Sequence, residues 1–87
     1  MKTLRTGIEQ AIQDLYGEDV SVVLTRPDEK FGDYTTNVAL QLAKTVGKSS
    51  LDIAEALAAK IRNNNPELLS DVTIAGPGFI NMTLQDH

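Results

Sequence analysis

The sequence predicts a small α+β domain in which helices cover one face of an antiparallel sheet. Apolar residues recur every three or four positions in three segments, as in amphipathic helices, and the last of these segments ends near residue 62. The segments after residue 72 instead alternate apolar and polar residues, as in strands. A short run rich in β-branched residues lies between the first two helical patterns. The expected order of elements is therefore α-β-α-α-β-β.

The first predicted helix spans residues 3–16 and ends at Gly17, a residue type that commonly terminates helices. Residues 20–24 are short and β-branched, so we expect a mostly buried strand there. Residues 25–33 contain Pro27, Gly32 and five charged side chains, which is typical of an exposed loop. The apolar stripe of the helix comprises Leu4, Ile8, Ala11, Ile12 and Leu15.

The second helix is predicted over residues 34–46, with Asp33 as its N-cap and Gly47 as its end. The third begins after Ser49, because Ser49 and Asp52 have the spacing of a capping box, and it continues to about residue 62. We expect both helices to point apolar side chains at the sheet. These side chains are Val38, Ala39, Leu42, Ala43 and Val46 in the second helix and Ile53, Ala54, Leu57 and Ile61 in the third.

The last two strands are predicted over residues 72–74 and 80–84, joined through Gly76-Pro77-Gly78. Pro at the second position and Gly at the third fit a type II turn, which requires a positive φ at Gly78. Hairpins favour other turn types, so a connection wider than two residues is also open.

Composition excludes several classes of site. The chain of 87 residues has no cysteine, so thiol chemistry is excluded, and its single histidine is His87, which removes nearly every histidine-based acid–base or metal site. The net charge of −4 excludes a strong general binder of nucleic acid, because phosphate neutralisation dominates such binding. No uninterrupted apolar run resembles a signal peptide or a membrane span, so we expect a cytoplasmic protein without a membrane partner.

Two further features have simple structural explanations. Asp28, Glu29 and Asp33 could bind a divalent cation, but no calcium-loop spacing accompanies them, so solvated charges and one helix cap are favoured. They leave a small hydrolase as the weakest functional hypothesis, and we expect no metal site. The Gly-Pro-Gly segment precedes a strand and not a helix, so it lacks the helix N-terminus that cradles phosphate.

The last strand carries the most informative pair of side chains. If Ile80, Met82 and Leu84 face the core, Phe79, Asn81 and Thr83 face the other way. An aromatic ring offers a stacking platform and an amide offers a donor and an acceptor, so together they can hold one unstacked base. Edge packing of Phe79 and a turn-adjacent polar Asn81 is the alternative. A protein-interaction module that uses the open sheet face is the alternative function.

Two motifs carry a resemblance to a known family. They are FGDYTTNVALQLAK at residues 31–44 and AGPGFIN at residues 75–81, with Ile53-Ala54 between them. The chain resembles the N-terminal additional domain of arginyl-tRNA synthetases over essentially all 87 residues. The resemblance implies a domain that contacts the D-loop at the elbow of tRNA(Arg) and accompanies a class I catalytic domain of the same chain.

The resemblance also indicates which residues bind tRNA. Phe79 and Asn81 match the aromatic and the amide that read the D-loop, and Gly76 and Gly78 position their strand. Candidate phosphate contacts, for which solvated surface is the alternative, are Arg26, Lys30, Lys44 and Lys48.

The family's two catalytic signatures and its anticodon-binding region are absent from this sequence. We therefore expect residues 1–87 to be a fragment of an arginine–tRNA ligase that is not an enzyme in isolation. The resemblance implies that this domain needs no cofactor, whereas ATP and Mg²⁺ act in the full-length enzyme.

Overall fold

The computed structural model describes residues 4–26, 32–64 and 68–85, and its fold is the predicted α+β class. The order of elements is also α-β-α-α-β-β, although the first strand is not the predicted segment. The elements are α1 Leu4–Tyr16, β1 Tyr34–Thr36, α2 Val38–Val46, α3 Ser50–Asn64, β2 Leu69–Ala75 and β3 Phe79–Leu84.

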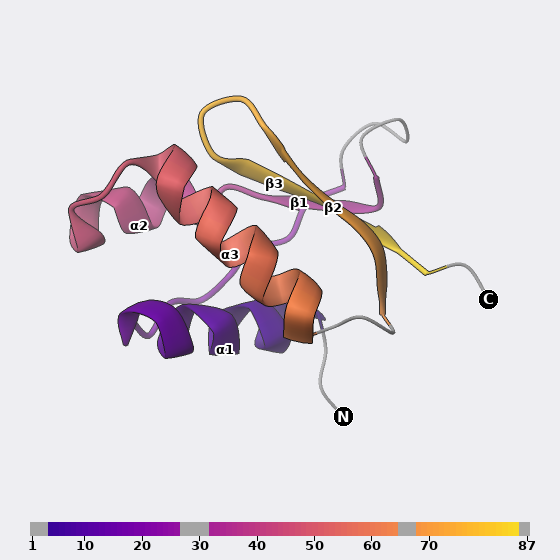
Figure 1. Ribbon diagram of the computed structural model, residues 1–87, viewed down its shortest axis with the longest axis horizontal. Helices are drawn as coiled ribbons and strands as arrows, with labels where there is room; N and C mark the ends of the chain where they lie inside the picture. The colour runs from indigo at the N-terminus through magenta and orange to yellow at the C-terminus, as the bar shows by residue number, and fades with distance from the viewer. Residues whose placement is uncertain (1–3, 27–31, 65–67, 86–87) are drawn as a thin grey trace.

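The three strands form an antiparallel sheet in the order β1-β3-β2, so the last strand of the chain is the central one. All three helices lie on the same side of this sheet (Figure 1). Helix α3 packs on β2 and β3, α2 packs on α3 and β3, and α1 packs on α3. None of the described helices covers the other face of the sheet. No helix within the described ranges is long and apolar enough to cross a membrane.

Helix α1 ends as predicted, because Gly17 adopts a φ of +66° and its N–H donates to the Gln13 carbonyl oxygen at 2.9 Å. Leu4, Ile8, Ala11 and Ile12 are buried. The prediction for Leu15 was wrong, since its side chain is 39% exposed. Leu15 continues the apolar stripe into the last turn of α1, but the buried part of the stripe ends at Ile12.

Residues 20–24 do not form the predicted strand. Val22 is buried, but its backbone N–H donates to Oε2 of Glu9 on α1 at 2.9 Å and not to a neighbouring strand. Val23 is 60% exposed. The segment reaches the sheet only at Thr25, which forms an isolated bridge with Thr35 of β1. The Glu9 side chain of α1 thus accepts the Val22 N–H, which in a β-strand would be bound by the backbone of a neighbouring strand.

Residues 34–36 form strand β1 and not the first turn of a helix, so the second helix begins later than predicted. Asp33 is not its N-cap. The backbone N–H of Asp33 donates to the Met82 carbonyl oxygen, and its Oδ2 accepts the N–H of Leu84, both at 2.8 Å. Asn37 takes the N-cap position instead. Residues 34–36 pair with β3 although their local pattern favours a helix. This pairing gives hydrogen-bond partners to backbone groups along one edge of β3, which would otherwise have none.

Helices α2 and α3 confirm most of the expected local signals. Gly47 ends α2 with a φ of +77° and donates its N–H to the Ala43 carbonyl oxygen. The Oγ of Ser49 accepts the N–H of Asp52 at 3.1 Å, as in the predicted cap. Val38, Ala39 and Leu42 are buried in α2, as are Ile53, Ala54, Leu57 and Ile61 in α3, while Ala43 and Val46 are partly buried.

The connection between β2 and β3 has three residues, wider than a two-residue turn, but its conformation differs from the predicted one. The positive φ lies at Gly76, at +59°, and not at Gly78. Gly78 is buried, and a Cβ added there would lie 3.1 Å from Cβ of Ser50 and 3.4 Å from Cγ of Leu40. Gly78 is therefore required by close packing on α2 and α3, while Ser50 Oγ donates to the Pro77 carbonyl oxygen at 2.5 Å.

Candidate nucleic-acid interface

Strand β3 presents its two faces as predicted. Ile80 and Met82 are fully buried under the helices, and Phe79 on the opposite face is 38% exposed. Asn81 also lies on the open face, but it is only 8% exposed because Thr35 of β1 and Thr73 of β2 flank it in register. The structure shows no hydrogen bond from the Asn81 amide to another described residue. An aromatic ring and an amide without a described partner therefore lie two residues apart, on the face that no described helix covers.

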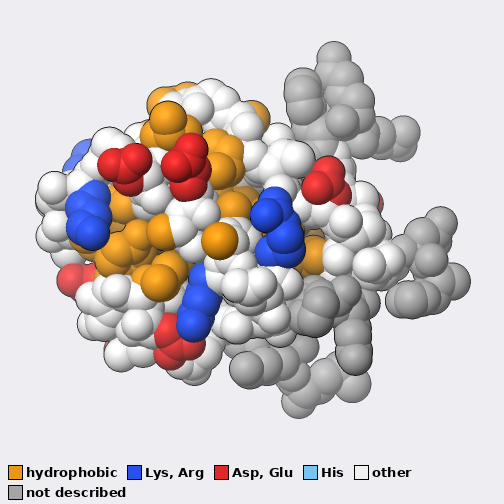
Figure 2. Space-filling view, viewed as in Figure 1, with side chains coloured by type: hydrophobic (Ala, Val, Ile, Leu, Met, Phe, Trp, Pro, Cys, Tyr) orange, Lys and Arg blue, Asp and Glu red, His pale blue; other side chains and the backbone are white. Residues whose placement is uncertain are grey.

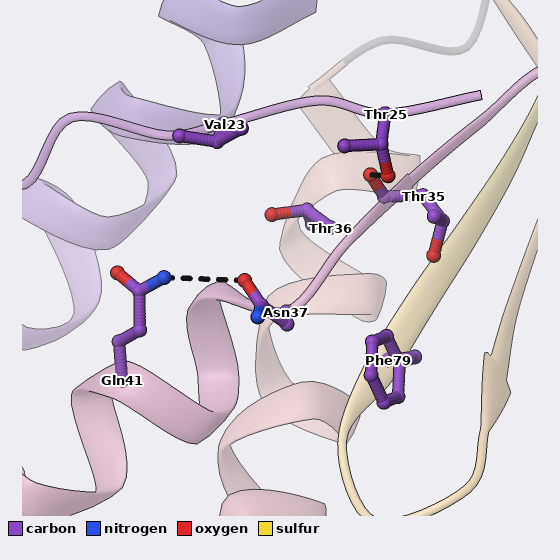
Figure 3. Close-up of a pocket in the computed structure, with 7 residues that line it drawn as sticks. All are labelled: Val23, Thr25, Thr35, Thr36, Asn37, Gln41 and Phe79. Carbon is purple, nitrogen blue, oxygen red and sulfur yellow. Dashed lines mark hydrogen bonds between the residues drawn. The ribbon is translucent and has the colours of Figure 1, made fainter. Parts of the chain in front are cut away.

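A pocket of about 260 Å³ opens beside Phe79 at the edge of this face (Figure 3). Its walls come from the segment before β1, from β1 itself, from the start of α2 and from the start of β3. Among the described residues that line it, none has a charged side chain. The lining residues are Val23, Thr25, Thr35, Thr36, Asn37, Gln41 and Phe79.

Two amide side chains meet in this pocket, where Gln41 Nε2 donates to Asn37 Oδ1 at 3.1 Å. Asn37 is at the N-cap of α2, yet its side chain makes no capping hydrogen bond. The Thr36 hydroxyl accepts the N–H of Val38 instead, at 3.3 Å. Asn37 directly follows Thr36, the last residue of β1 that pairs with β3, and it lines the same pocket as Phe79.

The sequence interpretation missed this pair. A helix expected from residue 34 placed Asn37 within its first turn, where an amide is an ordinary exposed residue. The available signal was the spacing of four residues between Asn37 and Gln41, which brings two side chains together on a helix surface.

The glycines predicted to position the reading strand do so in different ways. Gly78 packs against α2 and α3, as described above. Gly76 is exposed, and a Cβ there would lie 3.7 Å from Cδ2 of the Phe79 ring. The turn thus holds the start of β3 against the helices while the Phe79 ring lies beside Gly76.

The structure separates the predicted phosphate contacts. The guanidinium carbon of Arg26 lies 5.2 Å from the centre of the Tyr34 ring, and Nη2 donates to the tyrosine hydroxyl at 3.4 Å. Arg26 directly follows Thr25 of the pocket, whereas Lys44 is exposed in the last turn of α2 and Lys48 is exposed just beyond its end. Lys30 lies outside the described residues. Figure 2 shows basic and acidic side chains interspersed on the face that it views, without a patch of one sign.

Within the described ranges no three acidic or histidine side chains gather in one place. Asp28, Glu29 and His87 lie outside them. Asp33 is instead engaged by the backbone of β3.

Comparisons with known proteins identify the family of this chain. A family model described as the arginyl tRNA synthetase N terminal domain matches residues 2–84. An arginine–tRNA ligase of Listeria monocytogenes is 39% identical over 84 residues, which cover 95% of this chain and 15% of that protein. The arginine–tRNA ligase of Thioalkalivibrio sulfidiphilus is 43% identical over 93 residues, covering 97% of this chain and 15% of that protein.

Two solved structures show a similar fold. Thermus thermophilus arginyl-tRNA synthetase gives a TM-score of 0.77 at 29% identity, over 94% of this chain and 13% of that one. The Plasmodium falciparum arginyl-tRNA synthetase gives a TM-score of 0.81 at 23% identity, over 94% of this chain and 15% of that one. The chain spans about 15% of the length of the curated relatives named above.

Proposed function

The chain belongs to the family of arginyl-tRNA synthetase N-terminal domains, and we propose that it binds tRNA(Arg) at the D-loop, in the elbow of the molecule. The open face of the sheet is the binding surface. In this proposal Phe79 stacks on an unstacked base and the Asn81 amide hydrogen-bonds the edge of that base.

The observation that carries the proposal is the placement of Phe79 and Asn81. Phe79 is a large apolar side chain left 38% exposed beside a polar, uncharged surface, and the Asn81 amide has no partner among the described residues. Proteins that recognise unpaired RNA bases use this combination, because stacking supplies affinity and the amide supplies selectivity. The strands hold both groups rigidly on one face, so little side-chain order is lost on binding.

The proposal extends to the protein of which this domain would form a part. An arginine–tRNA ligase joins arginine to the 3′ end of its tRNA at the expense of ATP, with Mg²⁺ in the catalytic domain. In this proposal the reaction takes place in the catalytic domain, and the residues of this domain bind tRNA. The domain would hold the tRNA elbow while the acceptor end reaches the catalytic domain of the same chain.

The test is aminoacylation by the full-length ligase, measured as kcat/KM for tRNA(Arg). Phe79→Ala removes the stacking platform, and we expect kcat/KM to fall about ten-fold, since stacking is worth ~1–3 kcal/mol per base. Asn81→Ala should cause a loss of similar size. Leu51→Ala is the matched control, because Leu51 is also an exposed apolar residue, at 46%, but lies on α3. It should leave kcat/KM unchanged.

A tRNA series identifies the contacted base. Each D-loop nucleotide is substituted in turn, and the effect is measured with the native domain and with Asn81→Ala. At the base that Asn81 reads, the two changes should be non-additive, because each removes the same contact. Normal kcat/KM in both Phe79→Ala and Asn81→Ala would overturn the proposal and favour a protein-docking role for the face.

A further inference from the structure

We propose that Asn37 and Gln41 are specificity-determining residues, which read the edge of a nucleobase held against Phe79 in the adjoining pocket. The inference rests on the proposed function and adds a second reading element to Asn81. Its geometric basis is that Asn37, Gln41 and Phe79 all line the pocket, whereas Asn81 lies two residues along β3 from Phe79. A base stacked on the ring inside the pocket would thus meet the amide pair of Asn37 and Gln41, with Asn81 further along the strand.

The amide pair keeps unused hydrogen-bonding capacity. The bond from Gln41 to Asn37 occupies one N–H of Gln41 and one lone pair of the Asn37 carbonyl oxygen. Both N–H groups of Asn37 and the carbonyl oxygen of Gln41 have no partner among the described residues. The pair therefore offers donors and an acceptor side by side, which matches the mixed donor and acceptor edge of a nucleobase.

The pair is not explained by the stability of α2. An asparagine at an N-cap usually accepts a backbone N–H of the first turn. Here Thr36 takes that role, and Asn37 turns its amide to Gln41 in the pocket. Hydrogen bonds between exposed side chains four residues apart add little to a helix. The orientation of Asn37 thus leaves a normal capping interaction unmade.

Size and charge define the class of ligand. A pocket of about 260 Å³ is smaller than the roughly 300–1,000 Å³ of typical small-molecule sites, which suits one heterocycle and not a whole nucleotide. The described lining residues are all uncharged, which disfavours phosphate and favours a neutral ring. Threonine hydroxyls complete the polar wall, and Val23 adds an apolar contact opposite Phe79 (Figure 3).

The test measures binding of tRNA(Arg) to the full-length ligase, with Gln41→Leu and Asn37→Ala as the variants. Gln41→Leu keeps the bulk and the helix propensity of the side chain while removing its polar atoms. Both positions are exposed, so the fold should be retained. We expect about a ten-fold rise in Kd for each variant, the size of one good contact to a base edge. The matched control is Gln10→Ala, which removes a similar exposed pair, Gln10–Asp14, on α1.

Two patterns of result separate this inference from the proposed function. If Phe79→Ala weakens binding while Gln41→Leu and Asn37→Ala behave like Gln10→Ala, the amide pair does not read the base and the inference is overturned. If Phe79→Ala also leaves Kd unchanged, the proposed function itself fails. The supporting result includes a change in base preference. Across tRNAs substituted at the D-loop nucleotide, the spread of Kd values should narrow in Gln41→Leu, whereas loss of a purely structural role would weaken all of them equally.

Discussion

The carboxylate of Asp33 accepts a hydrogen bond from the backbone of Leu84, a residue 51 positions further along the chain. Gly32 precedes it with a φ of +113°, and a Cβ at Gly32 would lie 2.9 Å from the Met82 carbonyl oxygen. These two residues join the entry of β1 to the end of β3. Gly32 and Asp33 of the first motif therefore form a structural clamp, that is, a contact that joins β1 to β3, and they do not start a helix.

This clamp predicts the effect of changing Asp33. Asp33→Ala should lower the free energy of unfolding by ~1–3 kcal/mol, because it leaves the part-buried N–H of Leu84 without an acceptor. Asp33→Asn should cost less, since its carbonyl oxygen can still accept the bond. Urea unfolding followed by circular dichroism measures both.

Asp19→Ala is the control for the lost charge, because Asp19 is an exposed aspartate outside the helices and strands. If Asp33→Ala and Asp19→Ala have equal stability, Asp33 does not hold the two strands together.

Helix α3 and the β2–β3 hairpin depend on each other at Gly78. The start of α3 supplies Ser50, whose Oγ donates to the Pro77 carbonyl oxygen and whose Cβ closes the space beside Gly78. The hairpin that presents Phe79 is therefore seated on the helix layer, which fixes the reading strand relative to α2 and its amide pair.

Gly78→Ala should destabilise the fold by ~1–3 kcal/mol through overpacking against Ser50 and Leu40. Part of this loss should disappear in the Ser50→Gly background, because the nearest clashing atom is then absent. Urea unfolding of the single and double variants gives the coupling free energy.

Gly47→Ala provides the comparison for backbone strain alone. Gly47 has a φ of +77°, and a Cβ there would meet no atom within 4 Å. Its cost should not depend on Ser50. Zero coupling between Gly78→Ala and Ser50→Gly would contradict the packing explanation.

The whole molecule carries a net charge of −4, and acidic and basic side chains alternate on the face seen in Figure 2. Three of the cationic residues predicted to contact phosphate are described, namely Arg26, Lys44 and Lys48. Of these, only Arg26 is next in sequence to a residue that lines the pocket, and its guanidinium lies over the Tyr34 ring. Binding through stacking and amides, with one nearby cation, is less sensitive to salt than binding through a basic patch.

We expect the binding of tRNA(Arg) to this 87-residue chain to depend weakly on salt. The slope of the logarithm of the association constant against the logarithm of the salt concentration should be roughly −1, since each neutralised phosphate contributes ~−0.7 to −0.9. Arg26→Ala should bring the slope closer to zero, and Lys48→Ala should leave it unchanged. Fluorescence titration over a series of salt concentrations provides the slopes. A slope steeper than about −3 would mean that several phosphates are neutralised and that an uncharged site does not dominate binding.

The sequence by itself determined the features that depend on near neighbours. The helix ends at Gly17 and Gly47, the cap at Ser49 and the helical stripes, apart from Leu15, follow from interactions within about four residues and are present in the structure. The alternation that exposes Phe79 and buries Ile80 is equally local. For this reason the pair of Phe79 and Asn81 was predictable as a candidate site, although its role in binding stays a prediction.

The tertiary structure alone decided the features that depend on distant partners. Tyr34–Thr36 became a strand, and residues 20–24 did not, because β3 pairs with the former and Glu9 satisfies a backbone donor of the latter. A glycine is required at position 78 because Ser50 and Leu40 leave little room for a Cβ atom, and not because of its own φ. The pocket likewise joins side chains from Val23 to Phe79. A strand pair or a pocket wall is formed by residues far apart in sequence, so no window of neighbouring residues contains the information that selects it.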